Sequence, residues 1–325
     1  MLVLSRSDLE QVLEPRQLVD ALAAAFRSYA AGAGRVPPRT TVPVTDDGVL
    51  LLMPAVGAEK DGAALGTKLV TFYAGNQARG AASIQATYVL MDVGTGRVVA
   101  VLEGTFLTGL RTGAASALAA RYLARPDARR LVCFGAGVQA GFQLRCLTAA
   151  LPVERIAVVG RDPGRARGFA ESWTSRLGVP VEIVDDAGRA VRDADVVTCA
   201  TTATEPLFDG RWLPEGVHVD AVGAFQPSTR ELDAETIRRA RVFVDHPGAV
   251  ESAGDLVIPL RDGAILRSHV VGDLAALVSG AVEGRTHRRD VTLFKSVGFA
   301  LEDLVAARLA YDGAMARGIG KEVSL

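Results

Sequence analysis

The stretch from Leu131 to Gly141 constrains the fold more than any other part of this chain. A short apolar run ends in Gly135-Ala136-Gly137, and Ala140 fills the third small position of a G-x-G-x-x-G/A pattern. The pattern predicts a strand, a tight turn at Gly135, and a helix whose N-terminus faces a pyrophosphate beside Gly137. Ordinary strand-to-helix turns match it too, so the flanking sequence has to support a dinucleotide site.

The sequence after residue 130 alternates between apolar runs and helical segments. Such near-continuous apolar runs are typical of buried parallel strands, so we expect a Rossmann-type, doubly wound α/β domain. We expect its strands at Arg130–Phe134, Arg155–Gly160, Val181–Val184, Asp195–Ala200, Val217–Val222 and Arg241–Asp245. Small and polar residues follow several of these runs, where a doubly wound sheet binds its ligand. His246, at the end of the last run, is a candidate to line that crevice.

The first 120 residues have a different pattern. The sequence Ser7-Asp8-Leu9-Glu10 predicts a capping box, a second helix is expected from Pro15 to about Gly32, and a third at Leu110–Ala124. Between them we expect strands at Gly48–Met53, Thr67–Tyr73, Ile84–Asp92 and Arg97–Glu103. These residues predict an α+β domain, and the last helix, Val297–Ala316, is expected to pack on it.

Composition narrows the range of partners. The chain has 325 residues and a formal net charge of −1, so its overall charge favours neither nucleic acid nor an anionic membrane. The N-terminus does not resemble a signal peptide, and no uncharged run is long enough to span a membrane. Its three cysteines and four histidines show no metal-binding spacing, which favours buried thiols in a cytoplasmic protein without a metal.

The second strand of the dinucleotide unit indicates which dinucleotide binds. NAD-selective folds usually end this strand in a carboxylate that binds the ribose 2′-hydroxyl. Here the strand end carries Arg161, Arg165 follows, and Asp162 stands one residue late, where it suits a helix N-cap. A guanidinium at this place favours the 2′-phosphate of NADP(H), although NAD(H) stays possible and the arginines alone would also suit a solvated surface.

Six motifs in a fixed order resemble the ornithine cyclodeaminase/mu-crystallin family over nearly the whole chain. They are Thr67-Lys68-Leu69-Val70-Thr71-Phe72-Tyr73, Gly109-Leu110-Arg111-Thr112-Gly113-Ala114, Gly135-Ala136-Gly137-Val138-Gln139-Ala140, Ala203-Thr204-Glu205-Pro206, Ala221-Val222-Gly223-Ala224 with Arg230-Glu231-Leu232, and Phe294-Lys295-Ser296-Val297-Gly298. The resemblance implies a homodimer. It also implies a substrate-binding and dimerisation domain of residues 1–120 with 300–325, and an NAD(P)-binding domain of residues 121–299.

The resemblance also implies which residues bind substrate and cofactor. Arg39, Lys68 and Arg111 match substrate-binding residues of the family, with Lys68 and Arg111 as the catalytic candidates. Three cations at element ends suit an α-carboxylate, and we expect Arg111 at a helix N-terminus, although each alone would also suit the surface. Gln85 is a further candidate polar contact. The cofactor candidates are Gly135, Ala136, Gly137, Val138, Gln139, Arg161, Asp162, Arg165, Thr201, Val222, Ser296, Val297 and Gly298.

One departure from the family pattern bears on the reaction. The cyclodeaminases and the alanine dehydrogenase of the family carry an aspartate where this chain has Phe225, which cannot accept a proton. We therefore expect reduction of a cyclic ketimine carboxylate, with Phe225 against an apolar ring. The alternatives are an ornithine cyclodeaminase, an L-amino-acid dehydrogenase, and a non-catalytic NADPH-dependent small-molecule binding protein like mu-crystallin.

Overall fold

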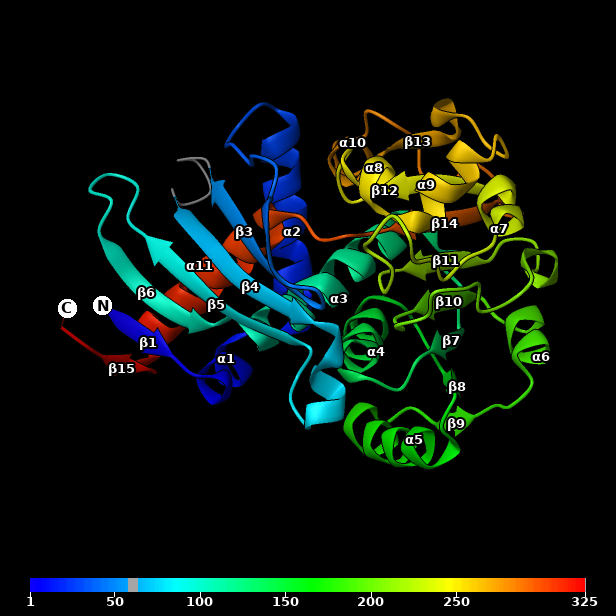
Figure 1. Ribbon diagram of the computed structural model, residues 1–325, viewed down its shortest axis with the longest axis horizontal. Coiled ribbons are helices and arrows are strands. Elements are labelled where there is room, and N and C mark those ends of the chain that lie inside the picture. Colours follow the sequence, from blue (N-terminus) through cyan, green and yellow to red (C-terminus); the bar gives the residue numbers. More distant parts are fainter. Residues whose placement is uncertain (58–63, 325) are drawn as a thin grey trace. The chain divides into compact units, whose positions relative to one another are not determined.

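The computed structural model describes residues 1–57 and 64–324 of the chain (Figure 1). The described residues divide into two compact units. One consists of Met1–Arg111 with Phe299–Leu325 and is called the sheet unit here; the other, Thr112–Gly298, is called the Rossmann unit. Helix α3 (Gly104–Leu123) contributes residues to both. No helix among the described residues combines the length and the apolar character that crossing a bilayer requires.

The sheet unit contains a seven-stranded sheet in the order β15-β1-β6-β5-β4-β3-β2. The strands are β1 (Leu2–Leu4), β2 (Thr40–Thr45), β3 (Gly48–Val56), β4 (Leu65–Tyr73), β5 (Ile84–Met91), β6 (Val98–Glu103) and β15 (Lys321–Glu322). Neighbouring strands are antiparallel except for the parallel pair β1 and β6. The same unit contains the short helical segments α1 (Arg6–Val12) and η2 (Ala74–Arg79).

Helix α11 (Ala300–Arg317) packs against α2 (Pro15–Ala30) and against β3, β4 and β5 (Figure 1). Helix α2 buries Leu18, Leu22 and Phe26 on one stripe, as its 3.6-residue apolar spacing predicts. The predictions that a helix begins at Pro15 and that the last helix packs on this unit are therefore confirmed. The predicted capping box is wrong by two residues, because Ser5 and not Ser7 is the N-cap, and the side chain of Asp8 accepts a hydrogen bond from the backbone N–H of Ser5.

The Rossmann unit contains an eight-stranded, wholly parallel sheet in the order β13-β12-β14-β11-β10-β7-β8-β9. Its strands are β7 (Arg130–Phe134), β8 (Arg155–Val159), β9 (Val181–Ile183), β10 (Val196–Cys199), β11 (His218–Ala221), β12 (Ala240–Val244), β13 (Val270–Asp273) and β14 (Val291–Lys295). The six predicted strands are present within about one residue at each end, whereas β13 and β14 were not predicted.

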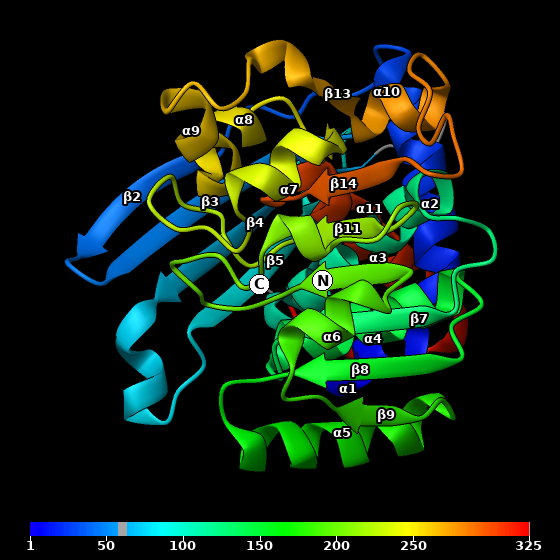
Figure 2. The ribbon, with the colours of Figure 1, turned by 90° about the vertical axis from the view of Figure 1, so that its right-hand side faces the viewer.

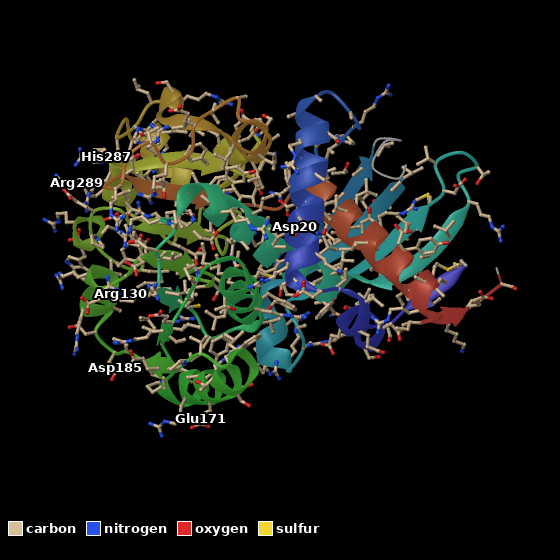
Figure 3. All side chains as sticks on the ribbon, turned by 180° about the vertical axis from the view of Figure 1, so that it is seen from behind. Asp20, Arg130, Glu171, Asp185, His287 and Arg289 are labelled. Atoms are coloured by element: carbon tan, nitrogen blue, oxygen red, sulfur yellow. The ribbon has the colours of Figure 1, made fainter. Side chains whose placement is uncertain are left out.

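Helices cover both faces of this parallel sheet, with α4 on one side and α6 and α7 on the other (Figures 1 and 2). The helical segments are α4 (Val138–Ala150), α5 (Pro163–Leu177), α6 (Ala187–Arg192), η3 (Gly210–Trp212), α7 (Ala234–Arg239), α8 (Ala249–Ser252), α9 (Gly254–Arg261), η4 (Arg267–His269) and α10 (Leu274–Ser279). Charged side chains such as Arg130, Glu171 and Asp185 lie on the outside of the unit (Figure 3). The predicted α/β fold is confirmed.

Candidate substrate and cofactor sites

The turn after β7 has the shape that a bound pyrophosphate requires. Gly135 adopts a left-handed φ of 112°, and a Cβ there would lie 2.7 Å from the carbonyl oxygen of Ala200. Gly137 is the N-cap of α4, receives no side-chain cap, and has open space where a Cβ would stand. Uncapped N–H groups beside open space at a helix N-terminus suit a phosphate, so the turn fits a dinucleotide. Ala140 is fully buried in the core between helix and sheet.

After β8, the carboxylate of Asp162 and the guanidinium groups of Arg161 and Arg165 have different surroundings. Asp162 caps α5 by accepting a hydrogen bond from the backbone N–H of Arg165 at 3.0 Å. Arg161 and Arg165 are both exposed. The N-cap that the sequence suggested for Asp162 is confirmed, and this carboxylate is occupied by the helix end.

The loops after β10 and β14 direct their polar groups into the protein. The hydroxyl of Thr201 donates to Glu231 at 2.8 Å, and the hydroxyl of Ser296 donates to Asp245 at 2.8 Å. The backbone N–H groups of Val297 and Gly298 also donate to Asp245. These candidate cofactor residues therefore have internal partners that determine the shape of the loops.

In the sheet unit, Lys68 and Arg111 meet at a single carboxylate. Lys68 Nζ lies 2.9 Å from Asp303 Oδ1, and Arg111 Nε lies 2.9 Å from the same oxygen. A second Arg111 nitrogen lies 2.6 Å from Glu302 Oε2. All four side chains are buried, with relative exposures between 0% and 5%. Two cations and two carboxylates thus form a buried cluster with no net formal charge, called here the Lys68 cluster.

Burial makes the charges of the Lys68 cluster sensitive to one another. Desolvation and the neighbouring Arg111 guanidinium lower the pKa of Lys68 from 10.5 to about 8, against the opposing effect of Asp303 and Glu302. For Arg111, burial opposes the charged form, but the two carboxylates prevail and raise its pKa. Desolvation, followed by the charge of Asp303, raises the pKa of Tyr88, which pairs with Lys68 across β4 and β5. The pKa of Lys68 therefore lies closer to physiological pH than that of an exposed lysine, whereas Arg111 keeps its charge.

The profile of the ornithine cyclodeaminase/mu-crystallin family matches residues 1–318. The chain belongs to this family. It is 33% identical to a Delta(1)-pyrroline-2-carboxylate reductase of Bacillus cereus, over 99% of both chains. It is 38% identical to the ketimine reductase mu-crystallin of Mus musculus, over 91% of both. The solved structure of Thermococcus litoralis Delta(1)-pyrroline-2-carboxylate reductase in complex with NADH and L-proline is similar with a TM-score of 0.96 and 39% identity, covering 99% of this chain and 100% of that one.

The structure brings two of the predicted substrate residues, Lys68 and Arg111, to one carboxylate, and the strand register places the other two, Arg39 and Gln85. Arg39 lies directly before Thr40, whose partner on β3 is Leu52. If the same register continues by one residue, Arg39 lies opposite Met53, and Met53 pairs with Lys68 on β4. The backbone of Arg39 is then two strand spacings, ~10 Å, from that of Lys68. Gln85 is exposed, and strand alternation points it to the sheet face opposite that of Lys68. The register therefore does not bring Gln85 to the Lys68 cluster.

Arg111 departs from its predicted position on the helix. Helix α3 begins at Gly104, two turns before Arg111, so the expectation that Arg111 stands at a helix N-terminus is wrong. The helix begins early because Glu103 accepts hydrogen bonds from the backbone N–H groups of Thr105 and Phe106. Arg111 therefore relies on Glu302 and Asp303, and not on the helix dipole.

Glu302 and Asp303 were not among the residues expected from the sequence. They form the first turn of α11, whose other residues toward the sheet are mainly apolar. Acidic residues in a first turn are commonly read as helix-dipole partners at the surface, but these two are fully buried. The sequence signal for these two residues is a pair of acids within the apolar stripe of a helix. Because buried carboxylates need cationic partners, such a pair indicates a buried ion-pair cluster.

The remaining expected residues lie in the Rossmann unit. Phe225 is half-buried in the loop after β11. His246 is the second residue after β12, and its Nδ1 accepts a hydrogen bond from the backbone N–H of Gly248 at 3.2 Å. His287 lies at the surface (Figure 3). Among the described residues, no three side chains of His, Cys, Asp or Glu are arranged to hold a metal ion.

Proposed function

We propose that this protein is an NAD(P)H-dependent reductase of cyclic ketimine carboxylates. Its substrates are 1-pyrroline-2-carboxylate or the six-membered 1-piperideine-2-carboxylate, and its products are L-proline or L-pipecolate. The observation that carries the proposal is the pair of buried cations, Lys68 and Arg111, held on one oxygen of Asp303. Full-length similarity to reductases of this substrate class supports it.

The charge balance of the Lys68 cluster suits a zwitterionic substrate. A cyclic imine that is protonated at nitrogen carries one positive charge on the ring and one negative charge on its carboxylate. Lys68 and Arg111 offer donors to the carboxylate, and a guanidinium binds carboxylates with good geometry. Asp303 Oδ2 is buried and has no hydrogen-bond partner among the described residues, so it is an acceptor suited to the ring N–H. Binding a molecule of zero net charge leaves the buried cluster neutral.

The titration of Lys68 suits a proton donor. Because its pKa is about 8, Lys68 is in its charged ammonium form in most molecules at pH 7. When the imine arrives unprotonated, Lys68 can transfer a proton to the ring nitrogen and so form the same protonated imine in the site. A bound reduced nicotinamide supplies the hydride that C2 of the imine receives. Arg111 keeps its charge throughout and orients the carboxylate.

Phe225 favours the reductase over the other enzymatic alternatives. Oxidation of a primary amine, the first step of a cyclodeaminase or an amino-acid dehydrogenase, needs a group that removes a proton from the substrate amine. Phe225 cannot do so at the position where the family resemblance implies an aspartate, whereas reduction of an imine does not begin with the removal of a proton from an amine. The non-catalytic alternative predicts binding without turnover, and a buried lysine with a pKa of about 8 favours catalysis over it.

We propose NADP(H) as the preferred dinucleotide. Arg161, two residues after β8, and Arg165, in the first turn of α5, are both exposed, and Asp162 is occupied as the N-cap of α5. Guanidinium groups at this position suit the 2′-phosphate. A bound nicotinamide dinucleotide as such is supported by the solved relative that contains NADH.

We also propose that the protein is a homodimer through the sheet unit. Val42 and Leu69 lie on the face of the sheet opposite Lys68 and are 40% and 39% exposed in the single chain. Gln85 lies on the same face. Apolar side chains on one face of a wide antiparallel sheet are suited to an interface with a second copy. The cytoplasmic location stays a prediction of the sequence.

The function is tested by following NADPH and NADH consumption with four candidate substrates. We expect consumption with 1-pyrroline-2-carboxylate or 1-piperideine-2-carboxylate, and formation of the cyclic L-amino acid. Formation of proline and ammonia from ornithine, without reduction of the imines, would establish the cyclodeaminase. Reduction of pyruvate with ammonia alone would establish the dehydrogenase, and dinucleotide binding without any turnover would establish the binding protein.

A further inference from the structure

The carboxylate of Glu231 ties two loops of the Rossmann unit together. It is fully buried and accepts a hydrogen bond from the backbone N–H of Thr201 at 2.7 Å and from its hydroxyl at 2.8 Å. Its other oxygen accepts from the backbone N–H of Gly223 at 2.7 Å. Thr201 follows β10 and Gly223 follows β11, two adjacent parallel strands. One side chain therefore sets the positions of two loops at the carboxyl edge of the sheet, where such sheets bind ligands.

Gly223 is required for this contact. A Cβ at residue 223 would lie 2.5 Å from Glu231 Oε1 and 2.3 Å from the carbonyl oxygen of Thr201. Neither distance is possible for a real side chain, and the second contact is with backbone. The glycine thus lets the carboxylate approach the two loops closely enough to accept all three hydrogen bonds.

An ion pair deeper in the unit fixes Glu231 itself. Asp255 Oδ1 accepts from the backbone N–H groups of Glu231 and Leu232 at 2.7 and 2.9 Å. Its second oxygen lies 2.8 Å from Lys295 Nζ, and both side chains have 0% exposure. Although burial opposes the charge of Lys295, the carboxylates of Asp255 and Glu231 raise the pKa of Lys295 above its ordinary value. Lys295 therefore stays charged and offsets part of the buried negative charge.

A third loop is attached to the same edge by Asp245. This residue follows β12, and its Oδ2 accepts from the hydroxyl of Ser296 at 2.8 Å and from the backbone N–H groups of Val297 and Gly298 at 2.8 and 2.6 Å. Ser296 directly follows Lys295, the last residue of β14. Three loops that the sequence assigns to the cofactor are therefore each shaped by a buried carboxylate.

Stability alone explains this arrangement poorly. Burying charged groups costs free energy, and well-packed apolar residues of similar volume commonly stabilise a core as well or better. Donors that point toward Glu231 and Asp245 also do not point toward a ligand. What the carboxylates achieve is a defined loop shape at the edge of the sheet, which is the preorganisation that a binding site needs.

We propose that Glu231 is a positioning residue for the nicotinamide dinucleotide. Its carboxylate holds the loops at Thr201 and Gly223 in the conformation that receives the cofactor, and the Asp255–Lys295 pair holds Glu231 in place. The proposal rests on the dinucleotide binding included in the proposed function. It explains why Arg230-Glu231-Leu232 and Phe294-Lys295-Ser296 stand among the family-like motifs, although Glu231 and Lys295 are buried away from the surface.

The test measures equilibrium binding of NADH and NADPH, by nucleotide fluorescence, in the absence of substrate. Glu231→Gln keeps the size of the side chain but replaces one acceptor oxygen by a donor. We expect its Kd for the preferred dinucleotide to rise about tenfold or more. Glu215→Gln, an exposed glutamate before β11, is the matched control and should bind as the parent does. Thermal unfolding without nucleotide shows whether each variant is folded at the assay temperature.

Thr201 distinguishes positioning from direct contact with the cofactor. Thr201→Val removes the hydroxyl that donates to Glu231, and Thr201→Ser keeps it. We expect weaker binding in the valine variant, parent-like binding in the serine variant, and no further loss when Thr201→Val is added to Glu231→Gln. Folded Glu231→Gln with unchanged Kd, or strictly additive losses in the double variant, would overturn the proposal.

Two further outcomes can be distinguished from a failure of the proposal about Glu231. If Glu231→Gln is unfolded, the valine and serine variants decide: recovery in serine supports positioning, and no loss in valine overturns it. If the parent binds neither dinucleotide, the proposed function fails, and that failure is visible before any variant is made.

Discussion

Asp303 Oδ1 lies 2.9 Å from Lys68 Nζ, although 235 positions separate the two residues in the chain. The same oxygen lies 2.9 Å from Arg111 Nε, so one carboxylate on the first turn of α11 joins a strand and a helix. Without Asp303 the two cations would repel each other in a medium that screens charge poorly. The Lys68 cluster is therefore the central feature of the sheet unit, and its chemistry leads to most of the predictions below.

Asp303→Asn should greatly reduce catalytic efficiency, although asparagine and aspartate have nearly the same size. The substitution leaves Lys68 and Arg111 buried without their shared negative partner, and breaking such a pair typically costs about 3–5 kcal/mol. We expect kcat/KM for the imine to fall roughly 100-fold or more, with NADH binding to the Rossmann unit retained. Asp312→Asn, on the same helix and paired with Arg308 at the surface, should behave as the parent. Equal losses in both variants would contradict the assignment.

The reaction should depend on pH through Lys68. The pKa of Lys68 is about 8, so the protonated form that donates to the imine disappears as the pH rises through 8. We expect kcat/KM for reduction to fall about tenfold per pH unit above 8, and oxidation of the cyclic amino acid to rise over the same interval. Steady-state rates in both directions measure this. Lys68→Arg should remove the opposed limbs, and limbs that persist in that variant would exclude Lys68 as their source.

Arg111 should be needed for the substrate and not for the cofactor. Arg111→Ala leaves Glu302 and Asp303 buried without Arg111, so we expect turnover to be lost together with part of the stability. Arg111→Lys keeps a charge but loses the fork of the guanidinium, and we expect about a 10- to 100-fold loss of kcat/KM with the fold retained. Nucleotide binding should survive in the lysine variant. A loss of nucleotide affinity there would remove Arg111 from the substrate role, with exposed Arg121→Lys as the control.

Arg161 should determine the preference between the two dinucleotides. Arg161→Ala removes a guanidinium from the end of β8, and we expect the Kd for NADPH to rise about tenfold while that for NADH stays within about twofold. Arg167→Ala, an exposed arginine on α5, is the control. If NADPH and NADH are affected equally, the 2′-phosphate is not what Arg161 recognises.

The local parts of this protein could be predicted from its sequence. The glycine turn at Gly135, the strands of the Rossmann unit and the helix from Pro15 depend on neighbouring residues, whose apolar spacing and φ requirements are visible in the chain. The N-cap role of Asp162 is of the same kind. Such features are decided within a few residues and therefore leave a signal.

Long-range pairing could not be predicted in this way. No local rule says that Asp303 should face Lys68, or that Glu231 should accept hydrogen bonds from Thr201 and Gly223. The face on which Gln85 lies could not be predicted for a related reason, because it depends on the register of its strand with the neighbouring strands. The family resemblance identified Lys68 and Arg111, but their counterions came only from the folded chain.

The measurement that tests the account most directly follows an isotope from cofactor to product. The protein is incubated with 1-pyrroline-2-carboxylate and reduced nicotinamide dinucleotide that carries deuterium at C4 on both faces, and the product is analysed by chiral chromatography and mass spectrometry. We expect L-proline with one deuterium at C2, and loss of this product in Asp303→Asn. An unlabelled or racemic product would contradict the proposed reduction, as would a protein that binds the dinucleotide but forms neither proline from this imine nor pipecolate from 1-piperideine-2-carboxylate.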